Sequence, residues 1–392
     1  MSSSISAVLY VLTVSTSPVS PGPGDAEEKK HHVKGGFANP WESFRFSPAK
    51  VARIMLSRHL TGKAHHPDTT PPTVPVQKPQ FLSGRETPHL RATWLGHACY
   101  YVEFPNGLRV LFDPVFEDRC SPFQWLGPKR YTELPCQIQD IPVVDAVVIS
   151  HSHYDHLSYP TVKEIAVRHP NCHFFAPLGN KEWFTRSGID NMTELDWWDE
   201  RDITLSPSTS PTEVRATDGA SEAADIKARI SCLPCQHSSG RSGFDQSTTL
   251  WSSWSIEAGG RRVYFAGDTG YRTVPELPDD VDDHAPEYDF PVCPAFKQVG
   301  KFRGPFDLGL IPIAAYQPRW VMSPVHADPH DAVQIFQDTQ CKKALGMHWG
   351  TWVLTEEDVL EPPAKLKQAL MKHDIPETGV FDICNIGESR EF

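Results

Sequence analysis

The sequence predicts an α/β protein in which two β-sheets lie face to face and helices cover their outer sides. Strand-like runs followed by a helical segment occur twice along the chain. The 392 residues are 39% hydrophobic and 22% charged, as in soluble globular domains with a sizeable core. In addition, several strand-like runs end in short polar segments rich in His and Asp, a pattern typical of a functional site at one edge of a sheet.

The N-terminal 90 residues differ in composition from the remainder. Residues 1–33 join a short apolar run to a Ser-, Pro- and Gly-rich stretch, and we expect a disordered leader. The run is shorter than the roughly 20 apolar residues that cross a bilayer. Residues 34–90 are expected to hold an aromatic and basic segment, with a helix from Pro48 to Leu60, and then a proline-rich extended connection. The basic stretch 41–60 either contacts a membrane interface or packs its apolar face on the body.

The body, residues 91–392, is predicted to form one domain of alternating strands and helices. In its first half we expect strands at 98–104, 109–112 and 143–150, a helix at 160–168 and a strand at 173–176. In its second half we expect strands at 251–258, 262–266 and 308–312, a helix at 329–337 and a strand at 343–347. In the segment from about residue 205 to 226, apolar residues do not recur at a helical or strand spacing. We interpret this segment as a flexible surface insertion.

Charge and cysteine content narrow the function classes. Lys and Arg number 37 against 49 Asp and Glu, so the formal net charge is 37 − 49 = −12. This balance argues against nucleic acid as a partner and requires that any contact with an anionic membrane be local. Nine cysteines, an odd number without a regular spacing, favour a reducing, intracellular location. The Ser-rich start also resembles a mitochondrial transit peptide, although it lacks the arginines.

A dense histidine cluster follows the apolar run that ends at Ile149. His151, His153, Asp155 and His156 lie within six residues. Imidazole and carboxylate groups suit zinc or a similar divalent ion, and zinc is favoured here over iron or manganese. In an extended segment the first two histidines point to the same side, and the next two ligands can turn toward a second ion. A solvated His-rich loop is the alternative, which the position after a buried strand disfavours.

Three more candidate ligands follow other predicted strands. Asp268 lies between two glycines, where its carboxylate can bridge two cations, and His237 and His348 occupy similar positions after their strands. Each of them alone fits a turn residue or a buried histidine equally well. Their common position at strand ends favours a shared metal site.

The motifs of the chain resemble those of a known family. The string HSHYDH at 151–156 is similar to the H-x-H-x-D-H signature of the metallo-β-lactamase superfamily. More specific strings are TWLGHA at 93–98, DPVF at 113–116, SPFQWLGPKRY at 121–131, AAYQPRW at 314–320 and MHWGT at 347–351. Together they resemble the N-acylphosphatidylethanolamine-hydrolysing phospholipase D family, from about Phe37 to Thr355. The resemblance implies a metallo-β-lactamase-like αββα sandwich, with two mixed sheets flanked by helices.

The resemblance also implies a set of site residues. One zinc ion would be held by His151, His153 and His237, the other by Asp155, His156 and His348, with Asp268 as the bridge. Tyr154 would contact the substrate. His326 would lie near the substrate phosphate as a hydrogen-bond donor or a proton donor, and with Asp268 it forms the expected catalytic pair. His97 either orients a ligand or is a structural turn residue.

The implied reaction is hydrolysis of N-acylphosphatidylethanolamine to N-acylethanolamine and phosphatidic acid, through attack of a metal-bridging hydroxide on phosphorus. The partner would be a phospholipid at a membrane surface, reached by an intracellular, peripherally bound enzyme. The sequence is also compatible with a homodimer. The alternative function is another reaction of the same fold, on a soluble phosphodiester or a sugar-phosphate lactone. Departures at Ser238 and at Pro324-Val325 leave the acyl-chain and head-group contacts undetermined. A non-catalytic scaffold is disfavoured, since structural zinc sites are closed cages of mostly Cys and His.

Overall fold

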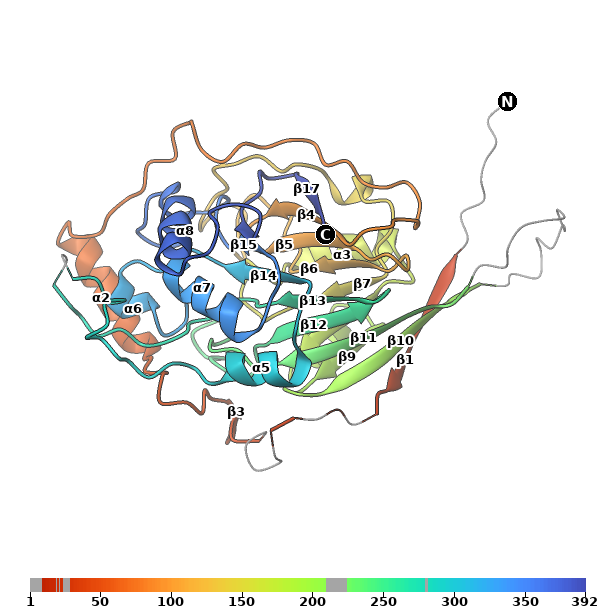
Figure 1. The fold of residues 1–392 in the computed structure, drawn as a ribbon, viewed down its shortest axis with the longest axis horizontal. Coiled ribbons are helices and arrows are strands. Elements are labelled where there is room, and N and C mark those ends of the chain that lie inside the picture. The colour runs from red at the N-terminus through yellow and green to blue at the C-terminus, as the bar shows by residue number, and fades with distance from the viewer. Residues whose placement is uncertain (1–8, 19, 21, 24–28, 209–223, 279–280) are drawn as a thin grey trace, which may run out of the picture.

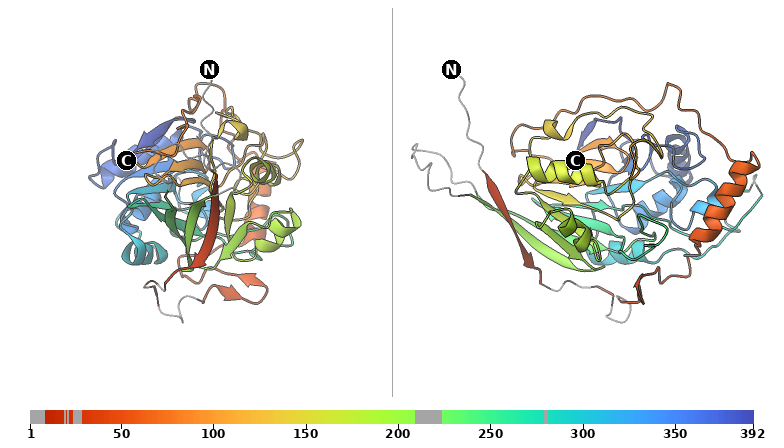
Figure 2. Two further views of the ribbon diagram at one scale, coloured as in Figure 1. Left: turned by 90° about the vertical axis from the view of Figure 1, so that its right-hand side faces the viewer. Right: turned by 180° about the vertical axis from the view of Figure 1, so that it is seen from behind.

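Two β-sheets pack face to face with helices on their outer sides, as predicted (Figure 1, Figure 2). The structure, a computed structural model, describes residues 9–18, 20, 22–23, 29–208, 224–278 and 281–392. One sheet has seven strands and the other eight, and each contains both parallel and antiparallel pairs. A separate hairpin is formed by β2 (His32–Val33) and β3 (Gly36–Phe37). The predicted mixed α/β sandwich is therefore confirmed.

The seven-stranded sheet has the order β17-β4-β5-β6-β7-β8-β9. Its strands are β4 (Arg91–Gly96), β5 (Cys99–Glu103), β6 (Arg109–Phe112), β7 (Ala146–Val148), β8 (His173–Pro177), β9 (Met192–Leu195) and β17 (Ser389–Glu391). Its outer face is covered by α3 (Tyr159–Arg168) and α4 (Lys181–Arg186), beside the short 3-10 helix η1 (Ile138–Asp140). Val162 and Ile165 of α3 are buried there against Val147.

The eight-stranded sheet has the order β1-β10-β11-β12-β13-β14-β15-β16. Its strands are β1 (Tyr10–Thr16), β10 (Glu200–Pro207), β11 (Ile226–Leu233), β12 (Ser253–Ala258), β13 (Arg261–Phe265), β14 (Leu308–Pro312), β15 (Ala344–Met347) and β16 (Phe381–Asp382). Its helices are α5 (Ala295–Arg303), α6 (Arg319–Met322), α7 (Pro329–Asp338) and α8 (Glu361–Lys372). Buried residues of α5, α7 and α8 join the same core as this sheet.

The main core lies between the two sheets. Because side chains alternate along a strand, Phe112 faces the other sheet while its neighbour Leu111 faces α3. The Phe112 ring lies 4.8 Å from that of Phe265, centroid to centroid, and joins β6 to β13 across the interface. This packing brings the carboxyl ends of β7, β13 and β15 to one edge of the sandwich, since neighbouring parallel strands end on the same side.

The expectation of a disordered leader over residues 1–33 is wrong for residues 10–16. These residues form β1, which pairs antiparallel with β10 along its whole length, from Tyr10 with Pro207 to Thr16 with Arg201. Tyr10, Leu12 and Val14 alternate toward the core and pack against it. The partner strand lies about 190 residues away in the sequence, so no local sequence pattern predicts the pairing.

The predicted insertion at 205–226 is narrower than expected at both ends. Leu205 to Pro207 complete β10, and Ile226 opens β11. The central part, 209–223, lies outside the described residues.

The helix expected from Pro48 to Leu60 is α2, with the same bounds. None of its residues is fully buried; Val51, Ile54 and Met55 are half-buried, and Leu56 and Leu60 are exposed. In the described part of the chain, no helix is both long and apolar enough to cross a bilayer.

Candidate metal centre

The candidate ligands meet at the edge where the strands of both sheets end. His151 follows β7, His237 follows β11, Asp268 follows β13 and His348 follows β15. All four side chains are at most 2% exposed. Glycines permit two of these turns. Gly267, before Asp268, has φ +61° and a Cβ there would lie 2.7 Å from the side chain of Ser150; Gly350, after His348, has φ +77°.

One group consists of three histidines. Nε2 of His151 lies 2.8 Å from Nδ1 of His153, and Nε2 of His237 lies 3.3 Å from the same nitrogen. The two residues of the H-x-H segment therefore converge on the histidine that follows β11. This is the triad expected for one ion.

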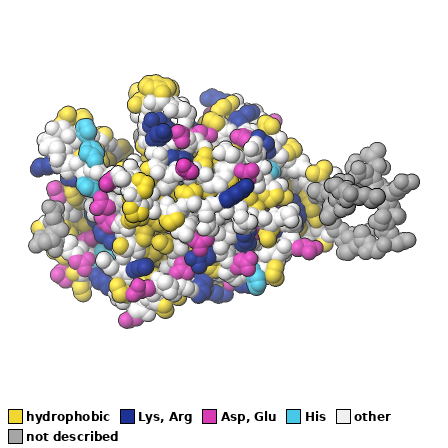
Figure 3. Space-filling model, turned by 90° about the horizontal axis from the view of Figure 1, so that it is seen from above, with side chains coloured by type: hydrophobic (Ala, Val, Ile, Leu, Met, Phe, Trp, Pro, Cys, Tyr) yellow, Lys and Arg dark blue, Asp and Glu magenta, His cyan; other side chains and the backbone are white. Residues whose placement is uncertain are grey.

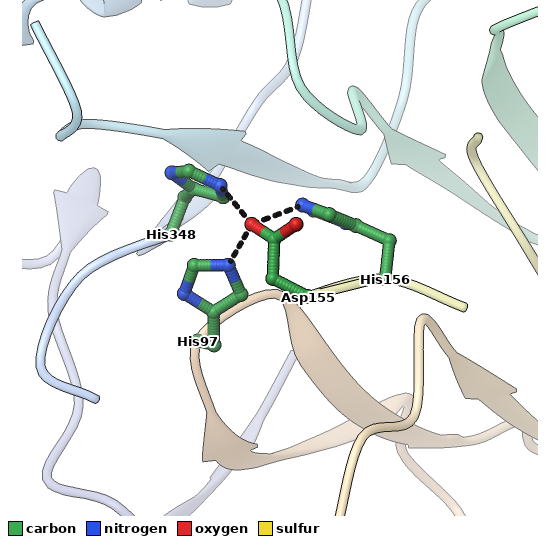
Figure 4. A group of neighbouring side chains, drawn as sticks. All are labelled: His97, Asp155, His156 and His348. Atoms are coloured by element: carbon green, nitrogen blue, oxygen red, sulfur yellow. Dashed lines mark hydrogen bonds and ion pairs between the residues drawn. The ribbon is translucent and has the colours of Figure 1, made fainter. Parts of the chain in front are cut away.

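A second group surrounds Asp155 (Figure 4). Its Oδ2 lies 3.3 Å from Nε2 of His156 and 3.5 Å from Nε2 of His348. Nε2 of His97, in the turn between β4 and β5, lies 3.0 Å from the same oxygen. The three residues expected to hold the second ion therefore lie together, and His97 contacts the Asp155 carboxylate.

Asp268 lies between the two groups. Its Oδ2 is 2.9 Å from Nε2 of His348 and 3.1 Å from Nε2 of His156. The same oxygen is 3.9 Å from Nε2 of His151 and 3.8 Å from Nε2 of His237. One carboxylate thus reaches both groups, as a bridging ligand must.

The spacing and chemistry of these atoms fit a pair of divalent cations. Ligands about 2.0–2.1 Å from a tetrahedral zinc ion lie about 3.3 Å from one another. The four separations of 3.1, 3.3, 3.3 and 3.5 Å are close to that value. Nε2 of His156, Nε2 of His348 and Oδ1 of Asp268 are buried and lack a hydrogen-bond partner. Buried polar atoms without partners are costly, and a bound cation would satisfy them.

Hydrogen bonds to Nδ1, the ring nitrogen opposite the Nε2 that faces the site, orient three of the histidines. Oδ2 of Asp113 lies 2.6 Å from Nδ1 of His156, and Oγ of Ser150 lies 2.9 Å from Nδ1 of His151. The carbonyl oxygen of Val325 lies 2.8 Å from Nδ1 of His237. A proton on each Nδ1 leaves Nε2 free to bind a metal ion.

Asp113 and Arg241 are site residues that our sequence reasoning did not identify. Asp113 directly follows β6, and this strand-end position, shared with the ligands, was an available signal. Arg241 donates through Nη1 to the carbonyl oxygens of Ser152 and Leu157, at 2.7 Å each, and so spans the loop that carries Asp155. No sequence pattern links Arg241 to this loop, because the contact joins residues more than 80 positions apart.

Tyr154 and His326 lie at the accessible side of the site. Tyr154 is half-buried, and its ring lies 3.9 Å below the guanidinium carbon of Arg241. Nδ1 of His326 is 4.0 Å from Oδ2 of Asp268 and lacks a hydrogen-bond partner. The ring of His326 is 5.2 Å from the rings of both His237 and His348, so it faces both ligand groups.

Burial and neighbouring charges shift the pKa values of the site residues in different ways. Burial lowers the pKa of His151 and His237 well below the usual range, which favours the neutral imidazole that binds metal. Burial also lowers the pKa of His97, to about 3. Burial alone would raise the pKa of Asp268, but His156 and His348 outweigh it and hold that pKa well below normal. The bridging position is therefore a carboxylate at neutral pH.

Comparisons with known proteins agree with this fold. The family model of the β-lactamase superfamily domain matches residues 108–349. A phospholipase D 1 of Caenorhabditis elegans, named as hydrolysing N-acyl-phosphatidylethanolamine, is 36% identical over 306 residues, 76% of this chain and 75% of the relative. A mitochondrial protein of the same name from Saccharomyces cerevisiae is 33% identical over 277 residues, 70% of this chain and 50% of the relative.

Solved structures show a more distant likeness. A metallo hydrolase from Ignicoccus hospitalis is 19% identical, with a TM-score of 0.48 over 77% of this chain and 98% of that one.

The fold and the cluster of ligands define an enzyme of the β-lactamase superfamily, in the class of metal-dependent hydrolases. Within it, the chain belongs to the family of N-acyl-phosphatidylethanolamine-hydrolysing phospholipases D, because more than a third of the aligned residues are shared over three quarters of a curated member.

Proposed function

We propose that the protein hydrolyses N-acylphosphatidylethanolamine to N-acylethanolamine and phosphatidic acid. The observation that carries this proposal is the position of Asp268, a buried carboxylate within 4 Å of four histidines from both ligand groups. A carboxylate between two cation sites suits phosphodiester hydrolysis, and the names of the two relatives specify the phospholipid.

Two zinc ions are the proposed cofactors. His151, His153 and His237 would hold one ion, Asp155, His156 and His348 the other, and Asp268 would bridge them. When bound, the pair supplies an activated water molecule and positive charge for the phosphoryl oxygens. The mixed carboxylate and imidazole donor set supports this assignment.

The residues around the ligands would position the substrate. His326 is proposed to donate a hydrogen bond from its unpartnered Nδ1 to a phosphate oxygen. Tyr154 would contact the lipid beside the metal pair, held in place by Arg241 above its ring. His97 would keep the Asp155 carboxylate oriented through the contact of its Nε2 with Oδ2.

The proposed setting is a membrane surface inside the cell, with the enzyme bound peripherally. The substrate is a membrane lipid, and the yeast relative is named as mitochondrial, which supports that organelle as the first to examine.

Product analysis tests the proposed reaction. Purified protein, loaded with zinc, is added to vesicles that contain N-acylphosphatidylethanolamine, beside a chelator-stripped sample and an Asp268→Asn variant. We expect release of N-acylethanolamine and phosphatidic acid by the loaded protein and a loss of at least 100-fold in both controls, as removal of a charge-stabilising group causes. Absence of product from a protein with two bound zinc ions would contradict the proposal and direct the search to soluble phosphodiesters and lactones.

A further inference from the structure

Three large apolar side chains are exposed together on one loop. The exposed fractions are 51% for Phe123, 74% for Trp125 and 56% for Leu126. Scattered single apolar residues on a surface need no explanation, but a contiguous group of this size indicates a contact surface. We call residues 118–130, which carry this group, the apolar loop.

The apolar loop has a defined internal structure. The amide nitrogen of Arg130 donates to the carbonyl oxygen of Asp118 at 2.8 Å, and the side chain of Gln124 bonds both the amide and the carbonyl of Arg119. Arg119 also donates to the carbonyl oxygen of Gly127. The rings of Phe123 and Trp125 are 5.4 Å apart at the tip. The tip is therefore held in its exposed position by bonds at the base.

The base of the loop is tied to the metal centre. Nε of Arg130 donates to the carbonyl oxygen of Glu117 at 2.8 Å, and its guanidinium lies 4.4 Å from the ring centre of Trp352. Trp352 donates through Nε1 to the carbonyl oxygen of Asp118 at 3.1 Å, and its ring lies 4.9 Å from that of His97. Since His97 contacts Asp155, the apolar loop rises directly beside the second ligand group.

The chemistry of the loop matches the interface of a phospholipid bilayer. Tryptophan and phenylalanine favour the head-group region, and leucine favours the acyl chains below it. Lys129, at the base of the loop opposite Arg119, is 60% exposed at its side chain and lies 3.7 Å from Oδ2 of Asp118. Its ammonium group can meet lipid phosphates, which a protein of net charge −12 needs locally. Figure 3 shows a projection with hydrophobic side chains at its tip and Lys and Arg side chains directly below them.

We propose that Phe123, Trp125 and Leu126 insert into the bilayer and place the metal centre over its phospholipid substrate. This inference rests on the proposed function for its choice of lipid as the occupant. It differs from the alternative in which the stretch 41–60 contacts the membrane, since it assigns docking to a loop next to the candidate ligands.

Co-sedimentation with vesicles that lack the substrate tests the docking step alone. The vesicles are made of phosphatidylcholine, with and without phosphatidylglycerol. The variant Phe123→Ser/Trp125→Ser/Leu126→Ser is compared with Val167→Ser/Met371→Ser, which removes apolar residues 76% and 53% exposed elsewhere on the surface. We expect the loop variant to bind at least 100-fold more weakly, since each inserted side chain contributes about tenfold, and the control to bind like the wild type. Equal melting temperatures verify that both variants are folded.

Two outcomes would overturn the proposal. One is unchanged vesicle binding by the loop variant. The other is a loss of binding confined to Leu56→Ser/Leu60→Ser, which would assign docking to α2. An activity assay separates this failure from that of the proposed function: the loop variant should cleave detergent-dispersed N-acylphosphatidylethanolamine at the wild-type rate and vesicle-bound substrate at a reduced rate. If the wild type cleaves neither form, the proposed function fails, while the vesicle-binding result still decides the docking step.

Discussion

Residues that hydrogen-bond to the candidate ligands, on the side away from the metal site, fix the orientation of those ligands. Oδ1 of Asp113 accepts from the amide nitrogen of Ser150 at 2.7 Å, and its Oδ2 accepts from the Ser150 hydroxyl and contacts Nδ1 of His156. One buried carboxylate therefore orients a ligand and the segment that precedes His151. Burial raises the pKa of Asp113, so its ionised state depends on these donors.

The substitution Asp113→Asn keeps the shape of this residue but removes its charge. We expect metal affinity to fall about 10- to 100-fold, the usual effect of losing such an outer carboxylate. Competition with a zinc-binding dye measures the affinity, and a melting curve serves as the folding control. A variant with wild-type metal affinity would show that the charge of Asp113 does not contribute to metal binding.

Asp196 is the anchor of the segment that precedes the hairpin β2–β3. Its Oδ1 lies 2.6 Å from Nε2 of His31, its Oδ2 lies 2.5 Å from Nζ of Lys29, and the His31 ring stacks 4.2 Å from Trp197. Burial would raise the pKa of Asp196, but the hydrogen bonds from His31 and Lys29 outweigh it and hold that pKa well below normal. The stability from this carboxylate is thus present above its unfolded pKa, about 3.9, and is lost as the pH falls toward the folded value.

We expect Asp196→Asn to lower the free energy of unfolding at pH 7 by about 1–3 kcal/mol, the range for charge-assisted hydrogen bonds. The difference from the wild type should shrink below about pH 4, where the wild-type carboxyl is protonated on unfolding. Urea unfolding at pH 7 and at pH 3.5 measures both values. A difference that stays constant between the two pH values would contradict the ion-pair explanation.

At the scale of elements, β1 covers what would otherwise be the edge of the larger sheet. Its pairing with β10 satisfies backbone groups that a free edge would offer to other chains. Removal of residues 1–17 should lower the free energy of unfolding by about 2–4 kcal/mol, because Tyr10, Leu12 and Val14 leave the core. It should also increase self-association through the exposed β10.

Thermal melting and size-exclusion chromatography of the shortened protein check both effects. A truncation that removes only residues 1–8 is the matched control, since it leaves β1 complete. An unchanged melting temperature after loss of β1 would show that the strand adds little to the fold.

At the scale of the whole molecule, the proposed metal site joins the two sheets. His151 and His156 follow a strand of the smaller sheet, whereas Asp268 and His348 follow strands of the larger one. A ligand that binds only the folded state stabilises it, so chelation of the metal should lower the melting temperature. The shift should be largely absent in Asp268→Asn, which lacks the carboxylate proposed to bridge the two ions. Differential scanning calorimetry with and without chelator measures it, and equal shifts in both proteins would contradict a shared bridge.

Local patterns were enough to predict many elements and to single out the candidate ligands that the fold brings together. The bounds of α2 agree with those predicted, and β14 matches its expected range, because helix and strand periodicity is recorded in neighbouring residues. The β1–β10 pair, by contrast, depends on a partner far away in the sequence. The contact of Arg241 could not be predicted for the same reason, since its two carbonyl acceptors belong to a loop far away in the sequence.

The sequence alone determined the class of the fold, the identity of the candidate ligands and the family motifs that carry them, because these features reside in short contiguous runs. Tertiary structure decided which atoms meet. It placed Asp268 within reach of both ligand groups, set Asp113 behind His156, and exposed Phe123, Trp125 and Leu126 together on one loop. The physical reason is that distances between strand ends depend on how two sheets pack, and no short stretch of chain contains that information.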